Sequence, residues 1–303
     1  MRLRLGTRGS PLALWQANMV ADALRAAHGL TDDAIEIVPT RTTGDVVQDR
    51  PLADVGGKAL WTKELDRALI AGDIDLAVHS MKDVETFRPA EIVIAAMPPR
   101  ADVRDRLIGA DSLDALPPNP RVGTSSPRRA AQVRRARPDA EIVLFRGNVD
   151  TRLRKLAAGE ADATLLAAAG LDRLDRVGVG TAIEIGTMLP APAQGAVGVE
   201  ARGDDAQVRA MLAAIDHPPT SACVRAERAL LAALGADCRS PVAALAQADG
   251  EGLWLRAEIL SEDGADWVAD AARFAVDDGE APARLAAALL DRAAPSLRAL
   301  FVG

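Results

Sequence analysis

The chain has 303 residues, of which 49% are hydrophobic, and a formal net charge of -7 at pH 7. This length exceeds what one hydrophobic core usually supports, so we expect two or three domains. The acidic balance argues against nucleic acid as a partner, because phosphates bind basic surfaces. The chain has no run of about 18 consecutive apolar residues, the length needed to cross a bilayer, so we expect no membrane partner. Two cysteines, without a Cys/His cluster of zinc-ligand spacing, predict a cytoplasmic protein with neither a disulfide framework nor a metal site.

Apolar, β-branched-rich runs alternate with helical periodicity in the first part of the chain. The predicted strands are residues 3–7, 35–40, 74–79 and 92–97, and the predicted helices are residues 11–27 and 59–71. In the first helix one stripe, which we expect to be its buried face, consists of Leu12, Trp15, Met19, Ala23 and Leu24. Strands that alternate with helices predict an α/β fold with a largely parallel, helix-covered sheet.

Two motifs recur in the same order farther along the chain. "LGTRGSP" at 5–11 is echoed by "VGTSSP" at 122–127, and "AGDIDLAVHS" at 71–80 by "AGEADATLLA" at 158–167. This repetition predicts duplicated α/β lobes that flank a cleft, the architecture of type II periplasmic solute-binding proteins. The segment at 189–202 is typical of a return crossover, so the chain would pass between the lobes twice. We therefore predict a first lobe of residues 1–98 with 194–217 and a second lobe of residues 99–193.

The pattern changes after residue 217. A helix at 219–234, strands at 242–248, 253–260 and 267–275, and a helix after 280 predict a small α+β third domain of residues 218–303. Cys223 shares a helical stripe with Ala226 and Leu230, so we expect it in the core. Cys238 lies in the polar loop 235–241 instead, where it is either a functional thiol or an ordinary loop residue.

Both repeats place a serine before a proline that opens a helix. Ser10 and Ser126 are therefore predicted to cap helix N-termini. Capping does not explain Arg128 and Arg129 in the first helical turn, because cations there oppose the helix dipole. An anion bound at that N-terminus would remove the conflict, and Arg8 stands in the equivalent turn of the first repeat. The alternative is that the basic residues between 128 and 155 form a solvated helix face.

Lys82 and Asp83 come just past the end of an apolar strand, in "LAVHSMKDV". Ligands bind at this end of the strands in open α/β sheets, whereas the alternative for these two residues is a surface ion pair. A polar loop at 42–58 ends at Lys58 and has the length of a lid.

Six segments follow one another between about residues 5 and 200: "TRGSPLALWQA", "VGGKALWTKELD", "AVHSMKDV", "VGTSSPRR", "RGNVDTRL" and "QGAVGVE". In this order they resemble the signature segments of porphobilinogen deaminases. "GADCRSPVA" in the third domain is similar to the loop where that family attaches its cofactor. The resemblance implies that the positions matching the family's cofactor- and substrate-binding set are Arg8, Ser10, Lys58, Lys82, Asp83, Ser126, Arg128, Arg129, Arg146, Arg152 and Arg173.

The resemblance also implies an activity, that of a hydroxymethylbilane synthase in porphyrin and haem biosynthesis. Such a transferase deaminates four porphobilinogen molecules and joins them head to tail, releasing 1-hydroxymethylbilane and ammonia. The chain grows on a dipyrromethane cofactor, which here would be held by a thioether to Cys238. Asp83 would be the catalytic carboxylate, and the arginines would bind the acetate and propionate groups of the substrate.

The resemblance also implies that this protein is a monomer, and we expect it to be cytoplasmic. The alternative function is that of a cytosolic solute-binding module, which would hold a small dianion and catalyse nothing. Three positions depart from the family pattern: Asp54 stands where relatives often carry lysine, Pro127 replaces a more usual aliphatic residue, and Ala193 precedes Gln194 where glycine is common. Pro127 is harmless in the first turn of a helix. Asp54 argues against carboxylate binding at its own loop position, and Ala193 is expected to stiffen the crossover.

Overall fold

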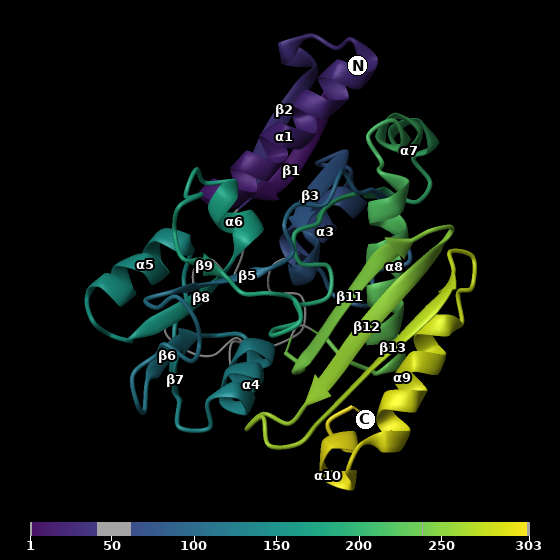
Figure 1. Ribbon diagram of the computed structural model, residues 1–303. Helices are drawn as coiled ribbons and strands as arrows, with labels where there is room; N and C mark the ends of the chain where they lie inside the picture. Colours follow the sequence, from purple (N-terminus) through teal and green to yellow (C-terminus); the bar gives the residue numbers. More distant parts are fainter. Residues whose placement is uncertain (1, 41–61, 238, 302–303) are drawn as a thin grey trace. The chain divides into compact units, whose positions relative to one another are not determined.

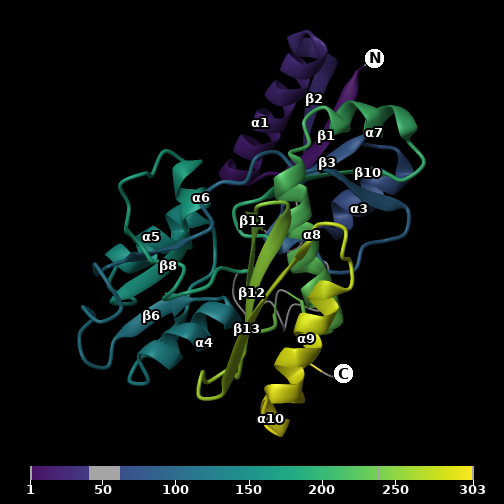
Figure 2. The ribbon, with the colours of Figure 1, turned by 45° about the vertical axis from the view of Figure 1, so that its right-hand side comes forward.

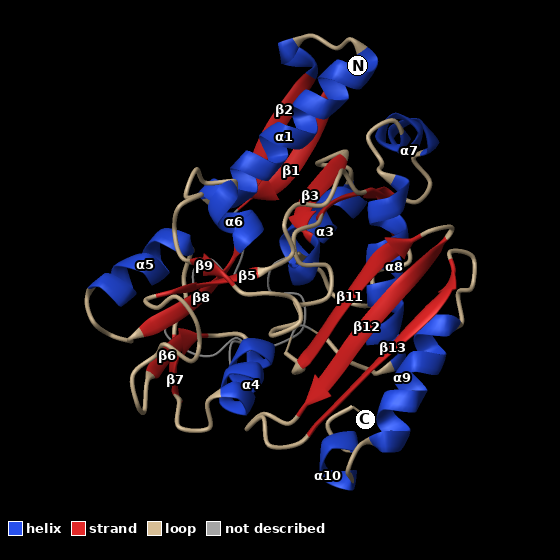
Figure 3. Cartoon of the chain, viewed as in Figure 1, coloured by secondary structure: helices blue, strands red, loops and turns tan. Residues whose placement is uncertain are grey.

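The computed structural model describes residues 2–40, 62–237 and 239–301, so the predicted lid loop, Asp54, Lys58 and Cys238 lie outside the described residues. The chain divides into two compact units, residues 1–101 with 195–221 and residues 102–194 with 222–303. The described strands form three separate sheets (Figure 3). Within these ranges, none of the helices combines the length and the apolar character needed to span a membrane.

The first sheet lies in the first unit and has the strand order β2-β1-β3-β10-β4. Figure 1 labels its strands β1, β2 and β3. Its strands are β1 (Leu3–Arg8), β2 (Ile35–Thr40), β3 (Leu76–Ser80), β4 (Ile92–Ala96) and β10 (Val197–Arg202). β1, β2 and β3 are parallel, whereas β10 runs antiparallel to both of its neighbours. The four predicted N-terminal strands are confirmed, because each is a short run rich in apolar and β-branched residues that the sequence reveals directly.

The described helices of this unit are α1 (Pro11–His28), α3 (Lys63–Ala71) and α7 (Ala206–Ala213), with 3-10 turns at Asp32–Ala34 and Met81–Asp83. The predicted buried stripe of α1 is wrong in part. Trp15 is 40% exposed, and the buried face runs instead through small residues such as Ala13, Ala17 and Ala21, and ends at Leu24 as predicted. Alanines allow the helix to lie close against β1 and β3, which leaves the bulky indole at the margin.

The second sheet has the strand order β7-β6-β8-β5-β9. Its strands are β5 (Asp105–Ile108), β6 (Arg121–Thr124), β7 (Glu141–Leu144), β8 (Ala163–Ala167) and β9 (Thr181–Ala182), and its helices are α4 (Pro127–Ala136), α5 (Val149–Ala157) and α6 (Ala168–Asp172). β6 is parallel to β7 and β8, and β5 is antiparallel to β8 and β9. Because β5 occupies the place that β10 has in the first sheet, the two sheets share one topology, and the predicted duplication is confirmed.

The third sheet is antiparallel and consists of β11 (Val242–Asp249), β12 (Gly252–Leu260) and β13 (Trp267–Ala275). Two helices, α8 (Pro218–Ala233) and α9 (Ala281–Arg292), cover one face of it, and the short α10 (Pro295–Arg298) follows (Figure 2). Cys223, Leu230 and Leu289 are buried between these helices and the sheet. The predicted core position of Cys223 is therefore confirmed, as is the predicted fold class of two α/β sheets with a small α+β domain.

Helix α4 connects the second and third sheets within the second unit. Gln132 donates a hydrogen bond to Glu258 on β12, and Arg135 Nη1 lies 2.6 Å from the other oxygen of that carboxylate. The Arg135 guanidinium also stacks 4.7 Å from the ring centroid of Trp267. These contacts join the second and third sheets into one compact unit. The predicted division of the chain into three domains stays a prediction.

The crossover from the second unit back to the first begins at a turn of unusual backbone conformation. Ala193 has a φ of 61°, in the left-handed region that favours glycine. Its N–H donates to the buried carboxylate of Glu227, which holds the turn in place. A glycine would adopt this conformation without the steric cost that the alanine Cβ brings.

Candidate functional site

A pocket opens at the carboxyl edge of the first sheet, between the N-terminal ends of α1 and α3. Arg8 comes from the end of β1, Ser10 from the N-cap of α1, and Asp83 from the 3-10 turn that follows β3. Ser10 Oγ accepts a hydrogen bond from Ala13 N at 3.3 Å, so the predicted cap is confirmed. Three residues that lie far apart in the sequence therefore meet at one edge, where open α/β sheets bind ligands.

The floor of this pocket is polar as well. Gln16 on α1 and Ser80 at the end of β3 form hydrogen bonds with each other, with Nε2 to Oγ at 2.9 Å. Lys82 is half-buried and stands beside Asp83 in sequence, but it is not among the residues that line the pocket. The pocket thus offers a guanidinium, a carboxylate and several neutral hydrogen-bonding groups to a small polar ligand.

A buried charge cluster lies on the β10 side of β3, next to the pocket. His79 Nε2 is 3.1 Å from Glu200 Oε2, and Arg88 Nε is 2.7 Å from Glu200 Oε1. Arg88 also pairs with Asp66 and Glu85. Burial by itself would raise the pKa of Glu200, but His79 and Arg88 more than offset this effect and lower the pKa to about 2. Because these partners are specific to the fold, Glu200 contributes stability to it.

This cluster predicts a defined loss of stability in acid. A carboxyl group whose folded-state pKa is depressed stabilises the fold above its ordinary pKa of 4.5, and that contribution disappears as the pH falls towards about 2. Urea unfolding of wild type and Glu200→Gln should therefore differ most near neutral pH and converge in this acid range. Glu91→Gln, at an exposed glutamate of the same unit, is the control. A difference between wild type and Glu200→Gln that stays constant with pH would contradict the prediction.

The second sheet presents its polar residues at the corresponding edge. Ser126 caps α4 after β6, with Oγ accepting from Arg129 N at 3.4 Å, as predicted. Arg152 on α5 donates from Nε to Gly147 O at 3.0 Å and from Nη2 to Ser125 Oγ at 3.3 Å. The loops that follow β6 and β7 are therefore joined by one guanidinium at the carboxyl edge of the sheet.

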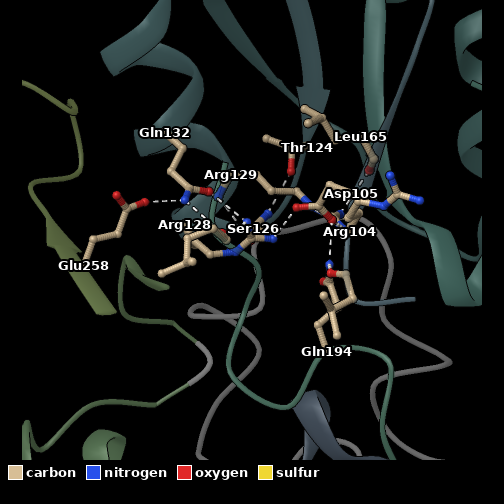
Figure 4. A network of polar contacts seen from close by, with 12 residues as sticks. Arg104, Asp105, Thr124, Ser126, Arg128, Arg129, Gln132, Leu165, Gln194 and Glu258 are labelled. Carbon is tan, nitrogen blue, oxygen red and sulfur yellow. Dashed lines mark hydrogen bonds and ion pairs between the residues drawn. The ribbon is translucent and has the colours of Figure 1, made fainter. Parts of the chain in front are cut away.

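Arg128 and Arg129 turn inward from the first turn of α4 and share the carboxylate of Asp105 at the start of β5 (Figure 4). Arg128 Nη2 lies 2.8 Å from Asp105 Oδ2, and Arg129 Nη2 lies 2.7 Å from Oδ1. The two arginines are only 3% and 5% exposed, so neither belongs to a solvated helix face. Burial alone would raise the pKa of Asp105, but the two guanidinium groups lower it well below its ordinary value.

The buried charges around Arg128 and Arg129 do not cancel. Asp105 faces two guanidinium groups, and Glu258, the other carboxylate that acts on Arg128, is paired with Arg135, which leaves one excess positive charge in the buried cluster. Two further arginines are almost fully buried: Arg146 after β7 at 6% exposed and Arg173 after α6 at 8%. Burial lowers the pKa of both Arg128 and Arg173, which means that the fold holds these cations at a cost. An anionic ligand would reduce that cost.

Sequence reasoning did not find Asp105, Glu200 or Arg88. Glu200 interrupts the mostly apolar strand β10, which was the available signal, whereas Asp105 begins β5 beside other charged residues and gave none. Their partners come from residues 23 to 121 positions away, and only the folded chain reveals them.

The solved structures that align with the chain are remote in sequence. An arginine-specific periplasmic binding protein of Salmonella typhimurium aligns with a TM-score of 0.41 and 12% identity, over 73% of this chain and 94% of that one. A putative periplasmic sulfonate-binding protein of Methylobacillus flagellatus aligns with a TM-score of 0.38 and 18% identity, over 75% of this chain and 67% of that one.

Similarity in sequence to known proteins is much higher than that of the aligned structures, and it points to one family. Residues 3–210 match the model of the porphobilinogen deaminase dipyromethane cofactor binding domain, and residues 221–291 match that of the porphobilinogen deaminase C-terminal domain. The porphobilinogen deaminase of Sphingopyxis alaskensis is 62% identical over 306 residues, which cover 99% of this chain and 96% of that protein. That of Paracoccus denitrificans is 52% identical over 270 residues, which cover 88% of this chain and 86% of that protein. The chain therefore belongs to the porphobilinogen deaminase family.

Proposed function

We propose that the chain carries out the porphobilinogen deaminase reaction (EC 2.5.1.61) with Asp83 as its catalytic carboxylate and the arginines of the second sheet as carboxylate-binding groups. The observation that carries the proposal is the match of both family models, which together span residues 3–210 and 221–291. The alternative, a solute-binding module for a dianion, would need neither the third domain nor a carboxylate among the cations. Porphobilinogen is the substrate that the family implies.

The buried cations fit the cofactor of this family. Dipyrromethane is built from two substrate units, each of which brings an acetate and a propionate group. The excess positive charge around Arg128 and Arg129, together with buried Arg146 and Arg173, is of the sign and residue type that such carboxylates require. When bound, the cofactor supplies a nucleophilic pyrrole carbon and the anchor for the growing chain. Its proposed attachment residue, Cys238, lies outside the described residues.

Asp83 is proposed to act where positive charge develops. As the aminomethyl group of porphobilinogen leaves as ammonia, the pyrrole ring becomes cationic, and a carboxylate near its nitrogen stabilises that charge and can move protons. The position of Asp83 in the pocket with Arg8 and Ser10 supports this role, because a guanidinium and a helix N-terminus can hold the substrate carboxylates there. Lys82 and Lys58 are proposed to assist binding from the same side of the sheet and from the polar loop, respectively.

The arginine proposal predicts altered chain growth. Substitution by Leu at each of Arg128, Arg129, Arg146 and Arg152 should impair cofactor assembly or stall elongation, each at its own length. Loss of a charged hydrogen bond costs about 1.5–3 kcal/mol, so the porphobilinogen concentration needed for each addition should rise about 10- to 100-fold. Native mass spectra taken with limiting porphobilinogen would reveal the number of pyrroles bound.

Arg154→Leu is the matched control, since Arg154 lies on the same helix as Arg152 but is exposed. Ladders of bound pyrroles identical to wild type in all four variants would contradict the proposed role.

A cytoplasmic location and a monomeric state are proposed from the family resemblance. Sedimentation of the purified enzyme tests the latter.

A further inference from the structure

The fully buried carboxylate of Asp105 binds both buried arginines at the start of α4. We infer that Asp105 is a positioning residue for the known reaction: it orients the guanidinium groups of Arg128 and Arg129 towards the carboxylates of the cofactor and the growing chain. The inference rests on the proposed function of these two arginines. It adds a residue that acts through them and does not itself contact a ligand.

Asp105 is held rigidly on its own side. Its backbone pairs with Ala167 in the antiparallel β5·β8 ladder, and its side chain is fully buried. Gln194 Nε2 donates to Asp105 Oδ1 at 2.9 Å and to Val103 O at 2.8 Å, which fixes the carboxylate from the crossover side. A group with this many constraints can set the direction of whatever it binds.

Each arginine is then fixed in a different way. Arg129 directs both Nε and Nη2 to Asp105 Oδ1, at 3.2 and 2.7 Å, and its Nη1 donates to Leu165 O at 3.0 Å. Arg128 uses Nη2 for Asp105 Oδ2, at 2.8 Å, and Nη1 for Gln132 Oε1 and Leu189 O. Two planar groups are therefore locked by contacts at two or more edges each (Figure 4).

One donor of this cluster is left over. Among the described residues, Arg128 Nε is buried and has no hydrogen-bond partner. A buried donor without an acceptor is costly, and it lies on the same edge of the guanidinium as Nη2, which Asp105 holds. The leftover donor and the excess positive charge both call for an acceptor with negative charge. Asp105 sets the direction in which that acceptor must approach.

A purely structural role for Asp105 would be to neutralise buried charge, and the two roles differ in what they predict for cofactor uptake. The probe is porphobilinogen, added to full-length protein purified from cells that cannot make it, and the readout is the rate at which the mass of two pyrrole units appears on the intact protein. Asp105→Asn keeps the shape of the side chain but removes its charge. Misplaced binding groups can cost on the order of 10²-fold in rate, so we expect uptake to slow by at least about 10-fold.

The matched control is Val122→Ala, a core variant of strand β6 in the same sheet that lowers stability and leaves every charge of the cluster in place. If Asp105→Asn slows uptake no more than Val122→Ala does at equal loss of thermal stability, the positioning role is wrong. Arg129→Leu separates this result from failure of the proposed function. Normal uptake by Arg129→Leu would overturn the role of the arginines themselves, whereas slow uptake by Arg129→Leu with normal uptake by Asp105→Asn would overturn only the inference.

A second comparison decides the matter if Asp105→Asn does not fold. The double variant Asp105→Asn/Arg128→Gln has the same net charge in the cluster as wild type, since one negative and one positive group are removed together. It should nevertheless take up the cofactor at least about 10-fold more slowly than Arg128→Gln alone, because Arg129 has lost its anchor. Equal or faster uptake by the double variant would show that charge balance is the whole role of Asp105, and would overturn the inference.

Discussion

Asp83→Asn should lower the rate of ammonia release by at least about 10²-fold, since general acid–base groups contribute roughly 10² to 10⁴ in rate. The substitution keeps the size of the side chain but removes its charge and its capacity to accept a proton. A carboxylate in a pocket for carboxylate-bearing ligands repels them in the ground state, so its benefit must come in the transition state, where the pyrrole ring becomes positive. Covalently bound cofactor and thermal stability should remain as in wild type.

The measurement is single-turnover release of ammonia or hydroxymethylbilane by Asp83→Asn and Asp83→Glu proteins whose cofactor content is known from intact mass. Asp83→Glu should retain more activity than Asp83→Asn, because it keeps the charge. Asp73→Asn, at an exposed aspartate that precedes β3, is the control. Turnover of Asp83→Asn within a few-fold of wild type would exclude Asp83 as the catalytic carboxylate and direct attention to Asp45, Asp49 and Asp54, which lie outside the described residues.

Cys238→Ala should abolish covalent attachment of the cofactor, whereas Cys223→Ala should leave it intact. Cys223 is 7% exposed and packed between α8 and the third sheet, so its thiol is an unsuitable site for a group that must reach the substrate. The intact mass of the Cys238→Ala protein should equal that of the chain alone, and that of Cys223→Ala should exceed it by two pyrrole units. The presence of the two-pyrrole mass on Cys238→Ala would assign the attachment to another residue.

The Cys238→Ala variant should also be less stable than wild type, by linkage. A ligand bound only by the folded state stabilises that state, and the covalently held cofactor is such a ligand. The thermal midpoint of Cys238→Ala should therefore fall to that of wild-type protein prepared without cofactor, and should not rise when porphobilinogen is added. A midpoint that rises with porphobilinogen in the variant would indicate non-covalent cofactor binding.

Local signals account for the parts of the fold that could be predicted. Continuous apolar runs located the parallel strands, serine before proline located the N-caps at Ser10 and Ser126, and the repeated segments indicated two sheets of equal topology. Each of these signals depends on residues close together in the chain. The buried face of α1 was predicted less well, because helical periodicity alone does not say whether alanines or larger side chains will meet the sheet.

By itself, the sequence determined the α/β class, the duplicated lobes, the third domain's elements and, through its ordered motifs, the family. Only the tertiary structure decided which charges meet. Arg128 and Arg129 could be recognised as unfavourable for a helix N-terminus, but their partner Asp105 is 23 or 24 residues away, on strand β5. Glu200 and Arg88 are 112 residues apart. The reason is physical: a buried charge requires a compensating charge in space, and the position of that partner along the chain is set by sheet topology, which no local pattern encodes.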